Sequence, residues 1–389
     1  VFKQPIIHKK GKFRAAQKKP AIKKDKLWKD TPYVRDQLLV GPRGQRKDQV
    51  KWQRNLPELL MASNKKVITM LVADKILPKW KGKTCPHCEV GILPDLCVEK
   101  RTGLYKHRCS SRHCHQYVSP HHLHPVFTEG KGSASRSLQM QASLLLLKLL
   151  RVPHPTIHVL LNVNHKAIED MEKRICDLRK AFVEKHEKNV VFGDGRTWKD
   201  VEADEATFDR RDISQDVNFK HLVMNNKTTT MWEQWAGVIQ RGPGAIRRTE
   251  WKTLGTKLLK DRKVVLHTDA ARSYKAKIAG VIHDKVVHAK KRVKRNGKFI
   301  WQHPKYVKVV THKIPKSNKK IVVKSGTQII DRCWRFLKDR VKVNQHTNAG
   351  SRQLCAKLRS AQYEYWYRNE DLWLKFGELC AENMRKFLK

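Results

Sequence analysis

The sequence predicts an α/β protein in which a mixed, partly parallel sheet is flanked by helices, and a small zinc ribbon and a helical region precede the sheet. Strand-like segments alternate with helical ones from residue 189 onward. Two close cysteine pairs lie between residues 85 and 114, and apolar residues recur at helical spacing between residues 137 and 188. A chain of 389 residues is long enough for two or three folded units.

The charge of the chain points to a polyanionic partner. Its 83 Lys and Arg residues outnumber 36 Asp and Glu, which gives a formal net charge of +47. Nucleic acid is the leading candidate, and a ribosome-associated or membrane-surface protein is the alternative on charge alone. No run of 18 or more apolar residues occurs, which argues against a transmembrane helix and a membrane partner. The nine cysteines, four of them at metal spacing, indicate a reducing compartment rather than a disulfide framework.

The first 130 residues divide into a basic arm and a cysteine-rich module. Residues 1–54 carry Lys and Arg throughout, and we expect a flexible arm that folds, if at all, on a phosphate backbone; a solvated tail is the alternative. Over residues 55–130, short helices precede the pairs Cys85-Pro-His-Cys88 and Cys109-Ser-Ser-Arg-His-Cys114. Two such pairs can hold one structural Zn²⁺ tetrahedrally. Weaker alternative ligands are Cys97, His87, His107, His113 and His115, and residues 119–124 are a weaker candidate for a second metal.

The spacing over residues 131–188 predicts a helix-turn-helix. Ser137 can cap a helix that runs to about Leu150, prolines end it, and a short helix and a long helix follow. In that arrangement the start of the last helix enters a major groove, so the base-contacting candidates are Asn164, His165 and Lys166. A plain helical bundle that links two domains, or a short coiled coil, fits the same spacing.

An α/β unit is predicted over residues 189–345. Strands are expected over residues 198–208, 231–240, 245–249 (after a turn at 242–244), 264–268 and 285–288, with a helix over 251–259. Asp204 lies in the first strand, and Asp269 follows the fourth at its carboxyl end, where open α/β sheets place their chemistry. A third acid, Asp331, lies near the start of a helix, where the helix dipole favours its ionised form. A capping box of Ser325 with Gln328, or Thr327 as an alternative cap, would begin that helix.

These three carboxylates suit Mg²⁺, or Mn²⁺, because such ions take a few carboxylates and complete their shell with water and phosphate. Two such ions can hold both oxygens of an in-line phosphoryl transfer. Glu205 is expected to face away from Asp204 and to pair with a Lys or Arg.

A basic insertion over residues 289–326 separates the last strand from the Asp331 helix. It includes an aromatic-bearing ribbon with Trp301 and Tyr306, which would suit DNA-strand contacts; an exposed edge ribbon protected by Lys is the alternative. Its candidate DNA-binding residues are Lys290, Lys291, Arg292, Lys294 and Arg295. The last segment, over residues 346–389, is expected to be helical and to pack on the sheet.

From about residue 56 to 385, the order of these features resembles the DDE transposases of the Merlin and ISXO-type insertion-sequence group. The matching residues are Asp204 with Glu205, Thr268-Asp269 with Tyr274, His288, Thr327 through Lys338, and the closing Tyr363-Glu-Tyr-Trp-Tyr-Arg-Asn369. The resemblance implies a ribonuclease H-like catalytic domain in which Asp204, Asp269 and Asp331 bind two Mg²⁺ or Mn²⁺ ions. Such enzymes cleave a phosphodiester at the terminal inverted repeats of double-stranded DNA, and the freed 3′-hydroxyl attacks target DNA.

The resemblance carries further expectations and two departures. It implies a homo-oligomer on DNA, located in the nucleus if the host is eukaryotic and otherwise in the cytoplasm or nucleoid. Glu205, His288 and Gln328 are possible auxiliary residues; His288 either touches the scissile phosphate or packs. The chain has Gln328 and Asp331 where the family usually shows Asn and Glu, and its basic insertion is long. A transposon-derived DNA-binding protein without catalytic activity is therefore the rival hypothesis, and a basic zinc-ribbon protein on RNA is a third.

Overall fold

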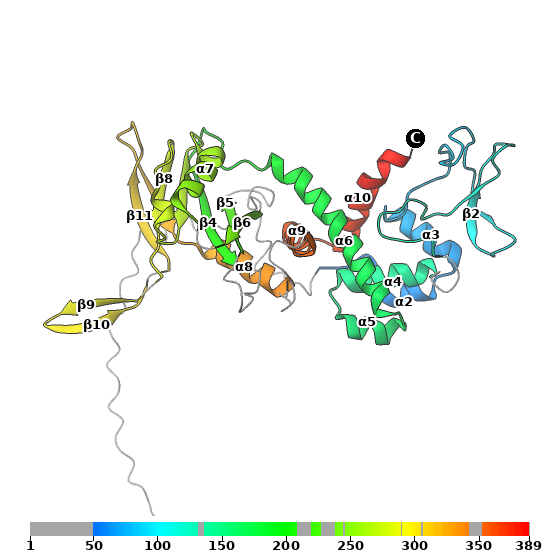
Figure 1. Ribbon diagram of the computed structural model, residues 1–389, viewed down its shortest axis with the longest axis horizontal. Helices are drawn as coiled ribbons and strands as arrows, with labels where there is room; N and C mark the ends of the chain where they lie inside the picture. The colour runs from blue at the N-terminus through cyan, green and yellow to red at the C-terminus, as the bar shows by residue number, and fades with distance from the viewer. Residues whose placement is uncertain are drawn as a thin grey trace, which may run out of the picture.

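The computed structural model describes residues 50–130, 136–207, 219–226, 238–243, 246–288, 290–304, 306–341 and 352–388. Nearly all of the predicted basic arm over residues 1–54 lies outside these described residues. Figure 1 shows a sheet at one end of the molecule, a cysteine-rich module at the other, and helices between them. No helix in the described ranges combines the length and the apolar character needed to cross a membrane.

A five-stranded mixed sheet carries the predicted acids. Its strands lie in the order β6-β5-β4-β7-β8. Strands β4, β5 and β6 pair antiparallel, whereas β7 runs parallel to β4 and β8 runs parallel to β7. The bounds are β4 (Lys199–Thr207), β5 (Phe219–Asn226), β6 (Val238–Pro243), β7 (Val264–Thr268) and β8 (Val281–Lys285). All five residues of β7 are buried, as expected for a central strand covered on both faces.

Helix α7 (Arg248–Leu259) connects β6 to β7 and covers one face of the sheet. The fully buried ring of Trp251 on α7 meets the ring of Tyr274 edge to face, with the centroids 4.9 Å apart. Tyr274 lies in the short helix η4 (Ser273–Lys275), which follows β7. This contact fixes the loop that begins with Asp269 against the helix layer.

The predicted strands over residues 198–208 and 264–268 are confirmed as β4 and β7, but the other three need correction. The strand predicted over residues 245–249 is wrong, because α7 already begins at Arg248. The turn predicted at 242–244 is also wrong, since β6 continues through Pro243. Strand β5 was missed, and the last strand begins at Val281, four residues earlier than predicted. Residues 231–237 lie outside the described residues.

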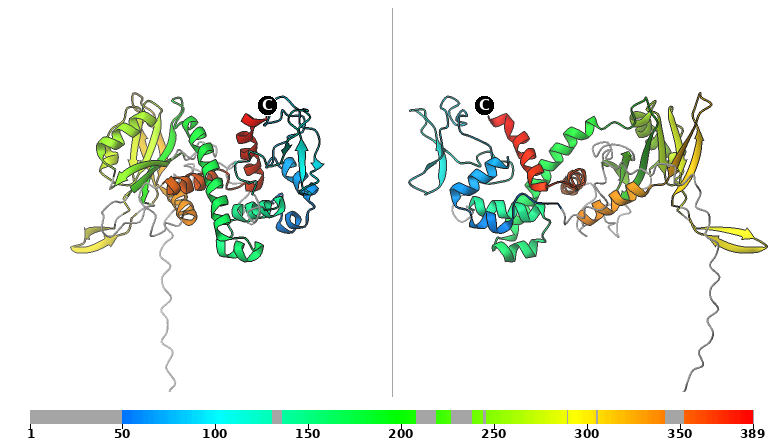
Figure 2. Two further views of the ribbon diagram at one scale, coloured as in Figure 1. Left: turned by 45° about the vertical axis from the view of Figure 1, so that its right-hand side comes forward. Right: turned by 180° about the vertical axis from the view of Figure 1, so that it is seen from behind.

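The basic insertion forms two antiparallel hairpins. The first consists of β9 (Lys291–Arg295) and β10 (Lys298–Gln302), and the second of β11 (Lys308–Lys313) and β12 (Lys320–Ser325). Figures 1 and 2 show the β9–β10 hairpin standing clear of the sheet. Helix α8 (Gln328–Arg340) follows β12 and packs on β4 and β5. The capping box predicted for this helix is wrong: Thr327 is its N-cap without a side-chain cap bond, and Ser325 is buried at the end of β12.

Helices fill the middle of the molecule. They are α2 (Leu56–Met61), α3 (Asn64–Ala73), α4 (Leu138–Leu149), α5 (His154–Leu161), α6 (His165–His186), α9 (Arg352–Trp366) and α10 (Leu372–Met384), with the single turns η3 (Glu187–Asn189) and η5 (Arg385–Phe387). The succession α4, α5, α6 follows the helix lengths and breaks that the sequence predicts for residues 137–188. Helix α6 leads from this cluster to the sheet (Figure 1).

The prediction that the C-terminal segment packs on the sheet is wrong. Helix α9 lies along α6 instead, and α10 contacts α4 and α6. Trp373 of α10 is fully buried, and its indole N–H donates to Asp74 at the end of α3 (2.8 Å). The apolar stripe of these helices indicates a buried face, but the long apolar face of α6 offered a second partner for that stripe.

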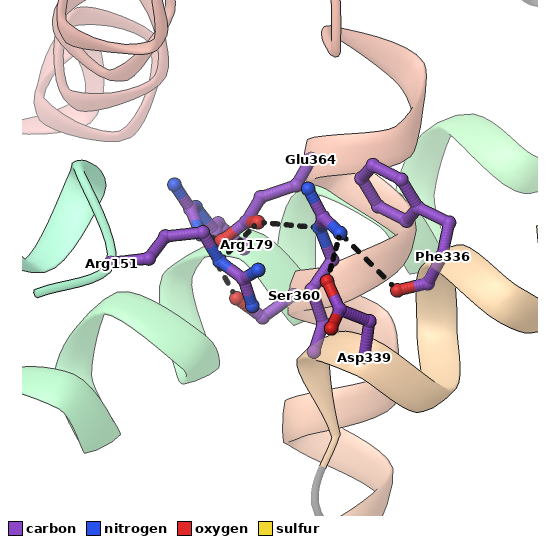
Figure 3. A network of polar contacts seen from close by, with 7 residues as sticks. Arg151, Arg179, Phe336, Asp339, Ser360 and Glu364 are labelled. Carbon is purple, nitrogen blue, oxygen red and sulfur yellow. Dashed lines mark hydrogen bonds and ion pairs between the residues drawn. The ribbon is translucent and has the colours of Figure 1, made fainter. Parts of the chain in front are cut away.

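A buried ion-pair network joins the sheet side of the molecule to the helices (Figure 3). Its centre is Glu364 on α9, whose carboxylate accepts from Arg179 on α6 (2.7 Å), Arg340 on α8 (3.2 Å) and Arg151 in the α4–α5 connection (3.2 Å). Arg179 also donates to Ser360 on α9 (3.1 Å). Removing one partner of a buried charge cluster is costly, so this network holds α8 in place relative to α6 and α9.

Candidate functional site

The three predicted catalytic acids line one pocket at the carboxyl end of β7. Asp204 comes from β4, Asp269 directly follows β7, and Asp331 lies in the first turn of α8. The pocket has a volume of about 410 Å³, and its remaining lining residues are Ala270, Ala271, Val287, His288 and Thr327. The structure therefore brings together acids that lie up to 127 positions apart in the chain (331 minus 204).

Each acid is held by its local backbone or by a neighbouring side chain. The carboxylate of Asp269 accepts the backbone N–H of Ala271 (2.9 Å), which turns the chain after β7 and fixes the side chain at the strand end. The carboxylate of Asp204 accepts the indole N–H of Trp334 on α8 (3.1 Å). The backbone N–H of Asp331 donates to the carbonyl oxygen of Thr327, so the acid is fixed in the first turn of the helix.

Burial and mutual repulsion shape the ionisation of this pocket. Burial raises the pKa of Asp204 to about 7, and the negative charges of Asp269 and Asp331 contribute to the rise. Burial also raises the pKa of Asp331, although His288 opposes it. Burial thus acts on the pKa of Asp331 in the direction opposite to the helix dipole, which was expected to favour its ionised form.

The pocket fits hard divalent cations by the chemistry of its donors. Crowded carboxylates whose charges raise a pKa are the oxygen ligands that Mg²⁺ and Mn²⁺ prefer. Within the described part of the chain, the ligand atoms of three or more Cys, His, Asp or Glu side chains lie mutually within 4.8 Å only at the four cysteines. The three carboxylates line one pocket without forming a cluster as tight as that of the cysteines.

Two residues that the sequence reasoning missed tie α8 to the sheet. The buried carboxylate of Glu202 on β4 accepts the backbone N–H of Ile330 (2.7 Å), one of the helix-start donors that no helical carbonyl can satisfy. Trp334 donates from the same helix to Asp204. Residues two apart on a strand share a face, so the position of Glu202 relative to Asp204 was the available signal.

The predicted auxiliary residues lie around the pocket in different ways. The carboxylate of Glu205 points away from Asp204, as expected, and accepts from the backbone N–H of Ile246 and the hydroxyl of Tyr274 (3.3 Å each). His288 lines the pocket, with its Nε2 3.3 Å from the hydroxyl of Thr327. Gln328 is the first residue of α8.

The four predicted zinc ligands form a compact cluster. The sulfurs of Cys85, Cys88, Cys109 and Cys114 all lie within 4.8 Å of one another; Cys85 is 3.9 Å from Cys114, and Cys88 is 3.6 Å from Cys109. Tetrahedral zinc with Zn–S bonds of about 2.3 Å places its sulfurs about 3.8 Å apart, so the cluster can hold one structural Zn²⁺. Three short strands carry the module, β1 (Cys97–Val98), β2 (Tyr105–Arg108) and β3 (Tyr117–Val118).

The loops of this module are shaped around the sulfurs. Backbone N–H groups donate to them, from Gly91 to Cys88 (3.3 Å) and from Ser111 to Cys109 (3.4 Å). The backbone N–H groups of Gly91 and Val90 lower the pKa of the Cys88 thiol to about 6, which favours the metal-binding thiolate. A Cβ on Gly91 would lie 2.3 Å from the Cys109 sulfur, so this position admits no side chain.

Three of the weaker metal candidates make other contacts. Cys97 donates its thiol to the carbonyl oxygen of Lys106 (3.4 Å), and a ring nitrogen of His107 lies 2.7 Å from the carbonyl oxygen of Pro94. In residues 119–124, buried His124 accepts the backbone N–H groups of Val126 and Phe127 and contacts the carbonyl oxygen of Ile76. Burial lowers the pKa of His124 to about 3, so it acts as a neutral structural residue.

The predicted DNA-contacting residues occupy two separate surfaces. At the start of α6, Asn164 is the N-cap and accepts the backbone N–H of Lys166 (2.7 Å), while the rings of His165 and His158 stack with centroids 4.4 Å apart. The side chain of Lys166 is 74% exposed and pairs with Asp170. The second surface is β9 together with the residue before it, and it carries the five predicted basic residues. They are Lys290, Lys291, Arg292, Lys294 and Arg295.

Comparison with known proteins yields one weak similarity. No family model and no curated protein matches the chain. Among solved structures, the chain is similar to the crystal structure of a pre-cleavage Mos1 transpososome, with 11% sequence identity over 40% of this chain and 61% of that chain, and a TM-score of 0.15. The match thus spans less than two thirds of the solved chain, and a similarity at this level carries no argument about activity.

Proposed function

We propose that this protein is a DDE-type DNA transposase with a ribonuclease H-like catalytic domain. The observation that carries the proposal is the convergence of Asp204, Asp269 and Asp331, from β4, β7 and α8, on one pocket of a strongly basic chain. The mixed sheet with its acids at β4, at the end of β7 and on a covering helix supports the ribonuclease H-like assignment, as the sequence resemblance implies.

In this proposal the chain's own residues position DNA for phosphodiester cleavage and strand transfer. Asp204, Asp269 and Asp331 would hold the cations at the scissile phosphate, the last of them from α8. Two Mg²⁺ or Mn²⁺ ions, when bound, activate the attacking oxygen and stabilise the leaving one. His288 lines the pocket within reach of a phosphate oxygen, and Thr327 orients its imidazole.

The partner in this proposal is double-stranded DNA, namely the terminal inverted repeats and a target. The cations of β9 and the start of α6 supply phosphate and base contacts, and the net charge of +47 favours both. We further propose that the protein acts as a homo-oligomer on DNA, in the nucleus if its host is eukaryotic and otherwise in the cytoplasm or nucleoid. One structural Zn²⁺ would hold the cysteine-rich module.

The rival function, a DNA-binding protein derived from a transposon without cleavage activity, rests on Asp331. Its side chain is one methylene shorter than the Glu of the family pattern, and burial raises its pKa. The cleavage experiment below separates the two functions, because the rival protein binds DNA without cutting it.

The deciding experiment is cleavage of DNA that contains the native flanks of the gene, in Mg²⁺ or Mn²⁺, by the wild type and by Asp269→Asn. We expect Asp269→Asn to lose cleavage and to retain DNA binding. Asp177→Asn is the matched control, since this acid is exposed on α6 and should leave cleavage unchanged. Undiminished cleavage by Asp269→Asn would place the active site elsewhere.

A further inference from the structure

The β9–β10 hairpin has two chemically different faces. Directly paired residues of antiparallel strands share a face, and the register pairs Phe299 with Lys294 and Trp301 with Arg292. One face therefore carries two aromatic rings and two cations. The neighbouring residue Ile300 pairs with Val293 and points to the other face, because successive side chains alternate.

The aromatic face is open to solvent. Phe299 is 58% exposed and Trp301 is 64% exposed. The guanidinium carbon of Arg292 lies 4.3 Å from the centroid of the Phe299 ring, so cation and ring already form a mixed surface. Large exposed aromatic side chains on a projecting element mark an interaction site.

The charge of the hairpin selects the class of partner. Residues 290–302 contain six Lys or Arg and no Asp or Glu. Two such hairpins repel each other, which disfavours a second copy of the chain as the occupant of this face. A phosphate backbone neutralises the cations, and the bases attached to it are the planar groups that stack on aromatic rings.

The hairpin starts at the rim of the acidic pocket. His288 lines that pocket two residues before Lys290, and the chain returns through Tyr306, whose ring centroid is 5.5 Å from that of His288. Five residues of strand extend about 17 Å, long enough to contact several nucleotides. A DNA strand that leaves the pocket can therefore pass along the hairpin.

We infer that the face formed by Arg292, Lys294, Phe299 and Trp301 binds an unpaired base of the DNA strand that leaves the pocket. Residues two apart on a strand are separated by about 6.8 Å, so a base can stack on the exposed ring of Trp301 beside the Arg292–Phe299 pair. In a paired duplex the bases are stacked on one another, so a duplex would contact the cations of this face but not its rings. The aromatic rings thus give the hairpin a preference for unpaired DNA near the cleavage site, an inference that rests on the proposed function.

The test compares two probes at one salt concentration and without divalent metal. One probe is a fully paired duplex, and the other is the same duplex with a five-nucleotide single-stranded extension that carries 2-aminopurine. In the wild type we expect tighter binding of the extended probe and a change in 2-aminopurine fluorescence. The double variant Phe299→Ala/Trp301→Ala should lose between about fivefold and a hundredfold in affinity for the extended probe, because stacking on one or two rings is lost. Its affinity for the paired duplex should stay the same.

Ile300→Ala is the matched control, since it truncates an apolar side chain of the same strand on the opposite face. It should leave both probes and the fluorescence change unaffected. Equal loss by Ile300→Ala, equal loss on both probes or no loss in the double variant would overturn the inference. The inference would also be overturned if the wild type formed a dimer without DNA and the double variant were a monomer. Because no cleavage is measured, failure of the catalytic assignment and failure of this inference remain distinguishable.

Discussion

At the scale of single residues, the decisive feature is the raised pKa of Asp204, which keeps its carboxyl protonated to a higher pH than usual. Its pKa of about 7 reflects burial beside two other carboxylates, and the pocket becomes a good cation site only when that proton leaves. In the proposed function, a metal ion and the proton would thus compete for one carboxylate.

This competition predicts the pH dependence of Mg²⁺ binding. Below pH 7 the apparent affinity should rise about tenfold per pH unit for each proton displaced, and it should level off above pH 7. Calorimetry over pH 5.5 to 8.5 (about the range that brackets this pKa) measures it. A pH-independent affinity over this range would show that Asp204 is not a ligand.

The raised pKa of Asp204 also sets the direction in which the stability of the metal-free protein changes with pH. The folded protein keeps the Asp204 proton up to about pH 7, whereas the unfolded chain loses it near the ordinary value of 3.8. The folded state therefore binds the proton more tightly, and the free energy of unfolding decreases as the pH rises between these two values.

At the scale of elements, the placement of α8 depends on β4. Glu202 satisfies a helix-start N–H, and Trp334 from the next turn reaches Asp204. Glu202→Met should lower the free energy of unfolding by about 1–3 kcal/mol, because the buried N–H of Ile330 loses its acceptor. Glu202→Gln keeps an acceptor oxygen and serves as the control. Equal stability of the Met and Gln variants in urea unfolding would mean that this bond does not hold the helix.

The cysteine-rich module is the second element that can be tested by itself. Cys88→Ser should reduce zinc content in metal analysis from one equivalent toward zero and should lower the thermal unfolding temperature, since a structural zinc site contributes directly to folding. Cys97→Ser is the matched control, because that sulfur contacts a backbone carbonyl outside the cluster. Full zinc content in Cys88→Ser would assign the metal to other ligands.

How far the sequence predicted these elements depends on where their information lies. The helices α4, α5 and α6 and the buried strand β7 have local signals in caps, prolines and apolar runs. Strand β5 has weaker ones, because Phe219-Lys-His-Leu-Val-Met-Asn-Asn226 mixes polar and apolar residues without clean alternation. The position of β5 is set by its pairing with β4 and β6, which is a long-range property.

The same reasoning applies to the site. Asp204 and Asp269 were predicted from strand positions, whereas the bonds of Glu202 to Ile330 and of Trp334 to Asp204 join residues 128 and 130 positions apart. The packing of α9 on α6 was missed for a related reason: an apolar stripe shows that a helix is buried but does not name its partner.

At the scale of the whole molecule, charge and architecture act together. The net charge of +47 predicts that DNA affinity falls steeply with salt, by about 10³-fold or more between 50 and 200 mM if at least six phosphates are neutralised. Binding isotherms over that range, fitted on a log-log scale, give the number of phosphates contacted. A flat salt response would exclude a nucleic acid as the main partner.

In the proposed function, the length of α6 has a consequence for where DNA would be cut. Its 22 residues span about 33 Å, nearly one turn of B-DNA at about 3.4 Å per base pair. If the first residues of α6 read a sequence, the helix holds the sheet about 33 Å from the residues that read it. The length of α6 would then set the distance between the sequence that is read and the position of cleavage. An insertion of two residues before Arg179 would rotate the rest of α6 by about 200° around the helix axis and pull Arg179 away from Glu364, so cleavage should be lost rather than shifted.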